Sequence, residues 1–258
     1  MLLLGSTIYP VKDVIRTLAG EQIKGVSFAV NTIRLPRMLA GLFAGFAFGI
    51  AGNTFQTMLR NPLANPNVIG ITAGSSAAAV FCIIVLHTSN AVVSIASVIA
   101  GLVTVTVIYL LSRAKPFSVG RLILVGIGMQ AMLNAAISYL LLVGAQQDIP
   151  AAFRWLSGSL NGAQMNQLPP LIISVLICTP IIVLLGKHLS ILELGEQSAS
   201  SLGVNTDQTR LLLILSAVCM IAIATAATGP IAFVAFLSGP IAKRLVGTGF
   251  SNALPAGL

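Results

Sequence analysis

Apolar residues run for about twenty positions at a time along this chain, and this pattern determines the solvent in which it folds. A helix needs roughly 20 apolar residues to cross the hydrocarbon core of a bilayer. Charged residues make up only 8% of the 258 residues, whereas a soluble domain carries about 25%. We therefore predict an all-α integral membrane protein, a multi-span helical bundle formed as one domain by residues 1–258. The seven expected spans are Met38–Leu59, Val68–Leu86, Ala91–Leu111, Leu122–Val143, Leu168–Leu185, Leu211–Ala227 and Pro230–Val246.

The net charge of +8 is spread between the apolar stretches rather than gathered in a stripe, which argues against a nucleic-acid partner. Lys and Arg in short loops mark the cytoplasmic side of a membrane protein. If the Arg60 loop is cytoplasmic, the inner set is Arg60, Arg113, Lys115, Arg121, Lys187, Arg210, Lys243 and Arg244, and Arg154 lies outside. Five further cations precede the first span and would fall on the outer side, namely Lys12, Arg16, Lys24, Arg34 and Arg37. Either this segment is cytoplasmic and the topology is inverted there, or positive charge is selected on the outer side.

The first span carries Gly41, Gly45 and Gly49 at intervals of four, a smooth ridge that lets helices approach closely in lipid. Amide side chains also occur inside spans, and hydrocarbon makes them costly unless they find partners. These faces should therefore point inward. Interhelical hydrogen bonds and a polar lining of a path explain them equally well. The amides are Asn53, Gln56, Gln130 and Asn134.

No pattern in the chain indicates catalysis or a metal site. It lacks the G-x-x-x-x-G-K-[ST] phosphate loop, so we do not expect it to hydrolyse ATP itself. His87 and His188 are single loop residues, and the three cysteines, Cys82, Cys178 and Cys219, are far apart in apolar stretches.

The six acidic residues all lie outside the apolar stretches. Ion-coupled transporters commonly carry charged residues within the membrane, where such residues are costly and are retained because they have a function. Their absence from the spans disfavours ion-coupled secondary transport and favours an external energy source. An ion-coupled secondary transporter or a channel without ATPases is the alternative.

The longest polar stretch after the first span is residues 187–210, which we expect to be a cytoplasmic loop containing one short helix. Glu193 and Glu196 suit the positive N-terminal end of that helix, and Gly203 suits its C-terminal end. Ala199 and Leu202, three apart, would share an apolar face for docking to a soluble partner.

Three segments, in this order, resemble the type II ABC importer permeases, the family of iron-siderophore, haem and vitamin B12 permeases. Residues 34–75 match its R-L-P-R, G-x-x-x-Q and N-P-L-A-x-P run, and residues 193–204, ELGEQSASSLGV, match its coupling segment. Residues 229–247, GPIAFVAFLSGPIAKRLVG, are similar to its G-x-I-x-F-x-x-L-x-x-P segment.

The resemblance implies a non-enzymatic permease subunit of about ten helices in a bacterial cytoplasmic membrane, paired as a homodimer or heterodimer. It also implies two cytoplasmic ATPase subunits, which would carry ATP and Mg²⁺, and an extracytoplasmic binding protein. No cofactor is expected on this chain itself. Ferric siderophores are favoured over haem or cobalamin as the cargo.

The resemblance also implies roles for particular residues. Arg34 and Arg37 would meet glutamates of the binding protein, to which planar guanidinium groups are suited. The ATPase-coupling helix would comprise Glu193, Leu194, Gly195, Glu196, Ala199, Leu202, Gly203 and Val204. The translocation path would be lined by Asn53, Gln56, Asn61, Pro62, Asn65, Pro66, Gln130 and Asn134.

The chain departs from the family pattern in two respects. Gly239-Pro240 stands where the family carries Pro followed by His or Gln. Most of the first family helix and the last two helices are also missing from this sequence, so we expect an incomplete permease domain of seven spans. A non-transporting fragment is therefore an alternative to a working permease.

Overall fold

A computed structural model of the chain describes residues 2–3, 5, 7–62, 64–65, 70–112, 119–193, 196–203, 205–246 and 257, without the side chains of residues 119, 193 and 196–198. All regular elements in these ranges are helical, as the sequence predicts. They are α1 (Val11–Leu18), η1 (Phe28–Arg34), α2 (Leu35–Met58), α3 (Ile71–Ile84), α4 (Asn90–Ser112), α5 (Val119–Val143), α6 (Ile149–Ser157), η3 (Met165–Gln167), α7 (Leu168–Leu184), α8 (Gly186–Glu193), α9 (Glu196–Ser201), α10 (Thr206–Thr228) and α11 (Val234–Val246).

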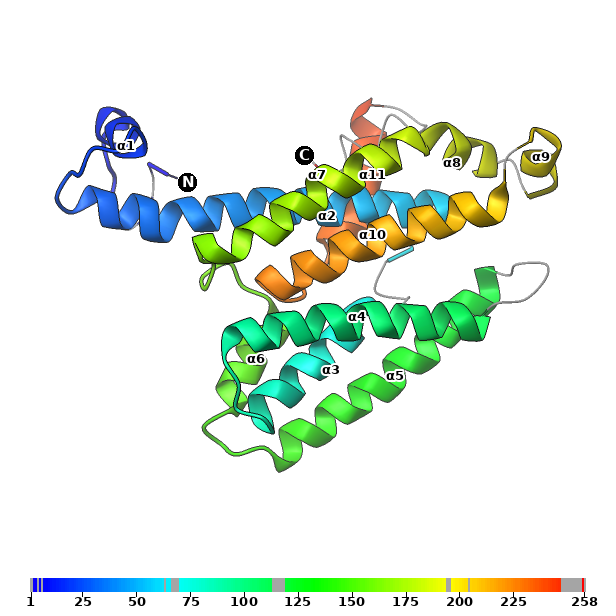
Figure 1. Cartoon of the computed structure of the whole chain (residues 1–258), viewed down its shortest axis with the longest axis horizontal. Helices are drawn as coiled ribbons and strands as arrows, with labels where there is room; N and C mark the ends of the chain where they lie inside the picture. Colours follow the sequence, from blue (N-terminus) through cyan, green and yellow to red (C-terminus); the bar gives the residue numbers. More distant parts are fainter. Residues whose placement is uncertain are drawn as a thin grey trace.

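The long helices form two layers. Figure 1 shows α2, α7 and α10 in one layer and α3, α4 and α5 in the other. Helix α10 packs against α2 and α7 in its own layer and against α3 and α4 in the other. The central packing uses small side chains, such as Ala47 and Ala51 on α2 and Ala217 on α10, each fully buried. Because small residues let helix backbones come close, van der Waals contact can hold the layers together in lipid.

The described residues contain five helices long and apolar enough to cross a membrane, where the sequence led us to expect seven. They are Phe28–Met58, Asn90–Ser112, Gly120–Val143, Met165–Leu184 and Thr206–Thr228. The chain is thus a multi-pass membrane protein. Two of the expected spans are shorter than predicted, and each has a local cause.

Helix α3 begins after Gly70, whose φ of 70° is left-handed, and runs for 14 residues. At 1.5 Å per residue it is about 21 Å long, shorter than the hydrocarbon core. It lies against α4, α5 and α6. The start of the expected span, Val68, is outside the described residues.

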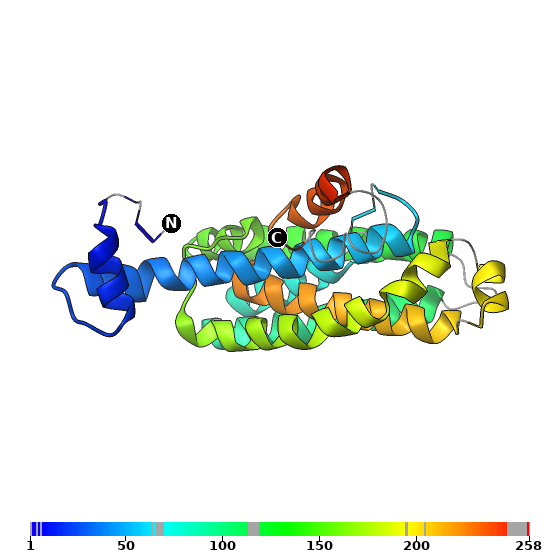
Figure 2. The ribbon, with the colours of Figure 1, turned by 90° about the horizontal axis from the view of Figure 1, so that it is seen from above.

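Helix α11 also differs from the expected span. It begins at Val234 rather than Pro230, because Phe233 has a φ of 68° that a helix does not accommodate. It then continues through Gly239-Pro240, with Pro240 inside the helix. Figures 1 and 2 both show α11 crossing α2 steeply instead of running alongside it.

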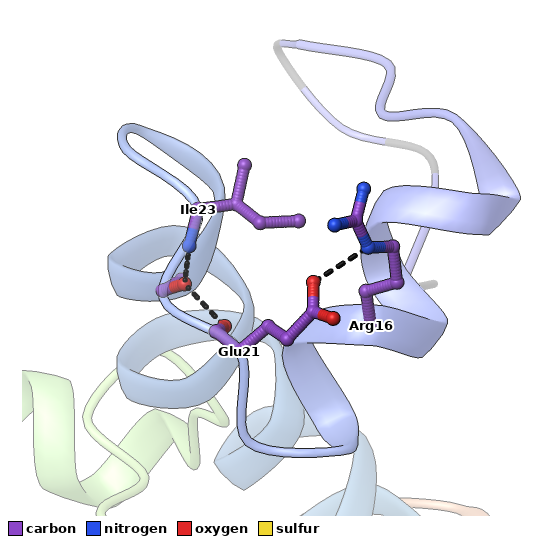
Figure 3. A network of polar contacts seen from close by, with 4 residues as sticks. Arg16, Glu21 and Ile23 are labelled. Atoms are coloured by element: carbon purple, nitrogen blue, oxygen red, sulfur yellow. Dashed lines mark hydrogen bonds and ion pairs between the residues drawn. The ribbon is translucent and has the colours of Figure 1, made fainter.

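The first long helix starts ten residues earlier than predicted, at Phe28, because the π-helical turns of η1 run directly into α2. Val30 is buried there with Val14 of α1 and Val26. The adjoining turn is held by polar contacts, shown in Figure 3. Arg16 Nε donates to Glu21 Oε2 (2.5 Å), and the Ile23 amide donates to Ser27 Oγ (2.8 Å). An exposed ion pair of this kind contributes only about 0–1 kcal/mol, so the apolar cluster dominates.

The two ends of the bundle carry different elements. Figures 1 and 2 place α8, α9 and the start of α10 at one end, together with the C-terminal end of α2, and α1 at the opposite end. The Arg60, Lys187 and Arg210 positions thus share one end, as the charge pattern predicts, and the Arg34–Arg37 segment belongs to the other.

Candidate functional site

Segment 187–210 is more helical than we expected. Its first part is helix α8, which packs on α2 and α7, and α9 follows and packs on α8 and α10. Leu189 and Leu192, three apart in α8, are both buried, so helix formation is favoured by removing them from solvent. Leu194, Gly195 and Val204, and the side chains of Glu193 and Glu196, lie outside the described residues, and their ATPase-coupling roles stay predictions.

Ala199 and Leu202 do not share an exposed face. Ala199 is 0% exposed and packs with Leu192, whereas Leu202 is 64% exposed. Helix α9 ends at Ser201, so helical spacing no longer relates the two residues. Gly203 follows with a φ of 80°, and its amide donates to the Ser200 carbonyl (3.0 Å), in agreement with the predicted C-terminal glycine. Leu202 therefore remains the apolar residue available to a partner, and Ala199 anchors α9 to α8.

Arg60 joins α2 to α8, a link that the sequence pattern did not suggest. Its Nη2 donates to the Leu192 carbonyl at the C-terminal end of α8 (2.9 Å). Arg60 follows the last residues of α2 and has a φ of 51°, a left-handed conformation in which glycine is usual after a helix. A cation at the C-terminal end of a helix also interacts favourably with the helix dipole.

The amides of the first span meet α11. Gln56 Nε2 donates to the Phe236 carbonyl (2.9 Å), an interhelical bond as anticipated for buried amides. Gln56 and Asn53 are 1% and 2% exposed, and their Oε1 and Oδ1 atoms have no hydrogen-bond partner among the described residues. Such buried acceptors suit a polar path or an ordered water.

Two glycines allow α2 and α11 to cross this closely. A Cβ on Gly239 would overlap Gln56 Oε1 and lie 3.3 Å from Asn53 Oδ1, and a Cβ on Gly52 would overlap the Ala235 carbonyl oxygen. The departure from the family pattern at Gly239 is thereby explained locally, because the glycine leaves room for the Gln56 amide. The expected glycine ridge makes a close contact at only one of these two positions. A Cβ at Gly41 would lie 3.2 Å from Leu160, whereas none of the described residues lies within 4 Å of a Cβ at Gly45.

Asn61, Pro62 and Asn65 follow Arg60 in a turn closed by the Ala64 amide, which donates to the Asn61 carbonyl (3.0 Å). The Asn61 amide in turn donates to the Gln56 carbonyl (3.0 Å). The turn thus continues directly from the end of α2. Pro66, the remaining predicted residue of this motif, lies outside the described residues.

Gln130 and Asn134 form a second polar location, separate from the α2–α11 crossing. They line a cavity of about 300 Å³ with Thr72 and Ser76 of α3 and with Leu156 of α6. Gln130 is half-buried and Asn134 is exposed. Helix α5 is otherwise largely apolar and exposed, so an amide on this face requires a polar neighbour or a path beside it.

The two predicted docking arginines are partly occupied by their own chain. Arg34 donates to the carbonyls of Leu2 (2.9 Å) and Thr7 (2.6 Å) and stacks over the Tyr9 ring at 4.6 Å. Arg37 Nη2 donates to the Asn161 carbonyl (3.2 Å). A guanidinium group has five N–H donors, so both retain capacity for a carboxylate. Arg34 also has a structural role in holding the N-terminal segment.

A second cavity, of about 460 Å³, is lined by Arg154 and Trp155 of α6 and by the α3–α4 connection. His87, in a left-handed conformation (φ 48°), places Nδ1 3.4 Å from Asp148 Oδ2. This His–Asp contact links the α3–α4 connection to the start of α6. This contact was not apparent from the sequence pattern, because the two residues are 61 positions apart.

An all-helical bundle with several helices long and apolar enough to cross a membrane, and with amide side chains buried inside it, defines a multi-pass membrane protein. The FecCD transport family matches residues 1–258, and the chain belongs to this family.

Individual relatives agree with this assignment. The chain is 34% identical over 247 residues to the ferric enterobactin transport system permease protein FepG of Escherichia coli, covering 95% of this chain and 74% of the relative. It is 35% identical over 230 residues to the Fe(3+)-citrate import system permease protein YfmE of Bacillus subtilis, covering 89% and 69%. A solved structure described as a metal-chelate type ABC transporter in an inward-facing conformation matches with a TM-score of 0.85 at 27% identity, covering 96% of this chain and 82% of that one. The chain is thus a permease component of the ABC importer type.

Proposed function

We propose that this chain is the membrane-spanning subunit of an ATP-driven importer of ferric siderophores in a bacterial cytoplasmic membrane. The observation that carries the proposal is the family match over residues 1–258, together with the fold shared with a metal-chelate transporter. The ferric enterobactin and ferric citrate permeases among its relatives support a ferric chelate as the cargo. Iron is cargo here and not a resident cofactor.

In this proposal two copies of the subunit, identical or related, enclose the path. Two ATPase subunits bind ATP and Mg²⁺ on the cytoplasmic side, and a binding protein delivers the chelate from outside. The exposed Asn134 on α5 supports a path along that helix, because an amide facing lipid would be costly. ATP-dependent closure of the ATPases would switch the bundle from outward-facing to inward-facing, and the cargo would cross chemically unchanged.

The ATPase contact is tested by co-purification with candidate ATPase subunits. Leu202, exposed beside α9, is replaced by Glu, which places a charge on the proposed docking surface. The matched control is Val11→Glu, since Val11 is also an exposed apolar residue but lies in α1 at the other end of the bundle. We expect the wild-type chain and the control to retain the ATPase and Leu202→Glu to lose it. Retention of the ATPase by the wild-type chain and both variants would contradict the docking assignment. No association of the wild-type chain would contradict the importer.

The binding-protein contact is tested separately at Arg37. Arg34→Glu would also release the carbonyls of the N-terminal segment, so Arg37→Glu is the more discriminating change. We expect weaker docking, and a smaller dependence of the remaining affinity on salt, because a screened charge pair is removed. Lys24→Glu, in the same outer region, serves as the control. Unchanged docking by Arg37→Glu would refute this role.

A further inference from the structure

Arg60 lies between the C-terminal end of α2 and helix α8. It follows the C-terminal end of α2, and its Nη2 donates to the Leu192 carbonyl of α8 (2.9 Å). Its backbone has a φ of 51°, where glycine is favoured. An arginine kept in a conformation suited to glycine indicates that the side chain itself contributes.

On the α8 side, the contact made by Arg60 continues to α9, the helix that we propose faces the ATPase. Leu192 is buried and packs with the fully buried Ala199 of α9. A displacement of α9 must therefore move Leu192, since close-packed side chains transmit displacement instead of absorbing it.

On the other side, the link continues through α2 to α11. Gln56, one helical turn before Arg60, donates to the Phe236 carbonyl at 2.9 Å. At Gly52, one turn before Gln56, an added Cβ would overlap the Ala235 carbonyl oxygen, so α2 and α11 are fitted together over two turns. Helix α2 is thus held to α8 just after its C-terminal end, and to α11 over the two preceding turns.

We propose that Arg60 is a positioning residue that transmits displacement of the α8–α9 segment to α2 and, through Gln56, to α11. This inference rests on the proposed function, because it assigns Arg60 a part in ATP-driven transport. A single charge-assisted hydrogen bond suits the task, since it is strong, directional and made to a backbone atom that moves with α8.

The test uses the transporter assembled from this chain, its ATPase and its binding protein in lipid vesicles. Three variants are compared with wild type for melting temperature, ATP hydrolysis and uptake of ferric chelate. Arg60→Gly removes the guanidinium and also relieves the left-handed backbone. Arg60→Lys keeps a cationic donor. Lys187→Met is the control, an exposed cation elsewhere on α8.

We expect Arg60→Gly to assemble and melt as wild type while chelate taken up per ATP hydrolysed falls about tenfold, within the usual range for coupling between sites. Arg60→Lys should recover most of that ratio, and Lys187→Met should match wild type. A wild-type ratio in Arg60→Gly would overturn the inference and leave the proposed function standing. Loss of assembly in both Arg60 variants would make the residue a structural support and would also overturn it. Failure of the wild-type chain to assemble with any ATPase would instead contradict the proposed function.

Discussion

The crossing of α2 and α11 makes a sharp prediction at Gly52. In Gly52→Ala the new Cβ would overlap the Ala235 carbonyl oxygen and lie 2.7 Å from the carbonyl carbon and 2.9 Å from Cα. Ordinary separations between carbon atoms begin near 3.5 Å, so relieving the contact with the carbonyl carbon alone needs a shift of α11 of about 0.8 Å, and relieving the overlap with the oxygen needs a larger one. No rotamer change relieves the overlap, because all three atoms belong to the backbone.

The cost can be worked from this geometry. Overpacking of a fitted interface costs about 1–3 kcal/mol. The displacement also strains the Gln56–Phe236 bond, and such bonds in membrane proteins contribute about 0.6 kcal/mol. Alanine in place of glycine within a helix returns about 1 kcal/mol. We expect a net destabilisation of about 2 kcal/mol, or a melting temperature lower by about 4–8 °C for a chain of this size.

The assay is thermal unfolding of the purified protein in detergent. Gly45→Ala is the matched control, since it lies in the same helix and none of the described residues is within 4 Å of its Cβ. It should melt at or slightly above the wild-type temperature. Adding Ala235→Gly to Gly52→Ala should not rescue stability, because the overlapping atoms remain. Equal melting temperatures for Gly52→Ala and Gly45→Ala would refute the close approach.

Three further outcomes are expected. Gly74→Ala should destabilise the packing of α3 on α4, because its Cβ would overlap Thr104 Oγ1. Adding Thr104→Ala should restore part of the melting temperature. A wild-type melting temperature for Gly74→Ala would contradict this packing. Asn205→Ala removes the side chain that accepts from the Gln208 amide (3.1 Å) at the start of α10, and should cost about 1 kcal/mol. Hydrogen exchange in the first turn of α10 should then be faster, and unchanged exchange would rule out the cap. Gln130→Leu, in the cavity beside α5, should reduce chelate uptake without lowering the melting temperature, whereas wild-type uptake would remove Gln130 from the path.

The long spans were predictable because a segment that crosses the hydrocarbon core must be a helix of about 20 apolar residues. The apolar stretch Ala91–Leu111 became α4 at Asn90–Ser112, and Leu168–Leu185 became α7 at Leu168–Leu184. The start of α11 was not predictable in this way. It depends on the left-handed backbone of Phe233, and hydrophobicity carries no information about that angle.

The sequence indicated which residues belong to the candidate sites, but not the hydrogen-bond and packing partners of those residues. The amide of Gln56 could be expected to face inward, but its partner, the Phe236 carbonyl, is 180 residues away. Similarly, spacing alone placed Ala199 and Leu202 on one face, whereas the packing of α9 on Leu192 turned Ala199 inward. In the sequence Arg60 is an ordinary loop cation, and its partner, the Leu192 carbonyl of α8, is 132 residues away. Such pairings arise from tertiary packing, which local pattern does not encode.

The central claim, that the chain is the permease of an ATP-driven ferric-chelate importer, is tested most directly by uptake into vesicles. The chain is reconstituted with its ATPase, ATP is enclosed on the ATPase side, and radiolabelled ferric chelate and binding protein are added on the other. Uptake that requires ATP, stops with ADP and persists when ionophores collapse all ion gradients is the predicted result. Uptake that proceeds without ATP and follows an ion gradient would contradict it.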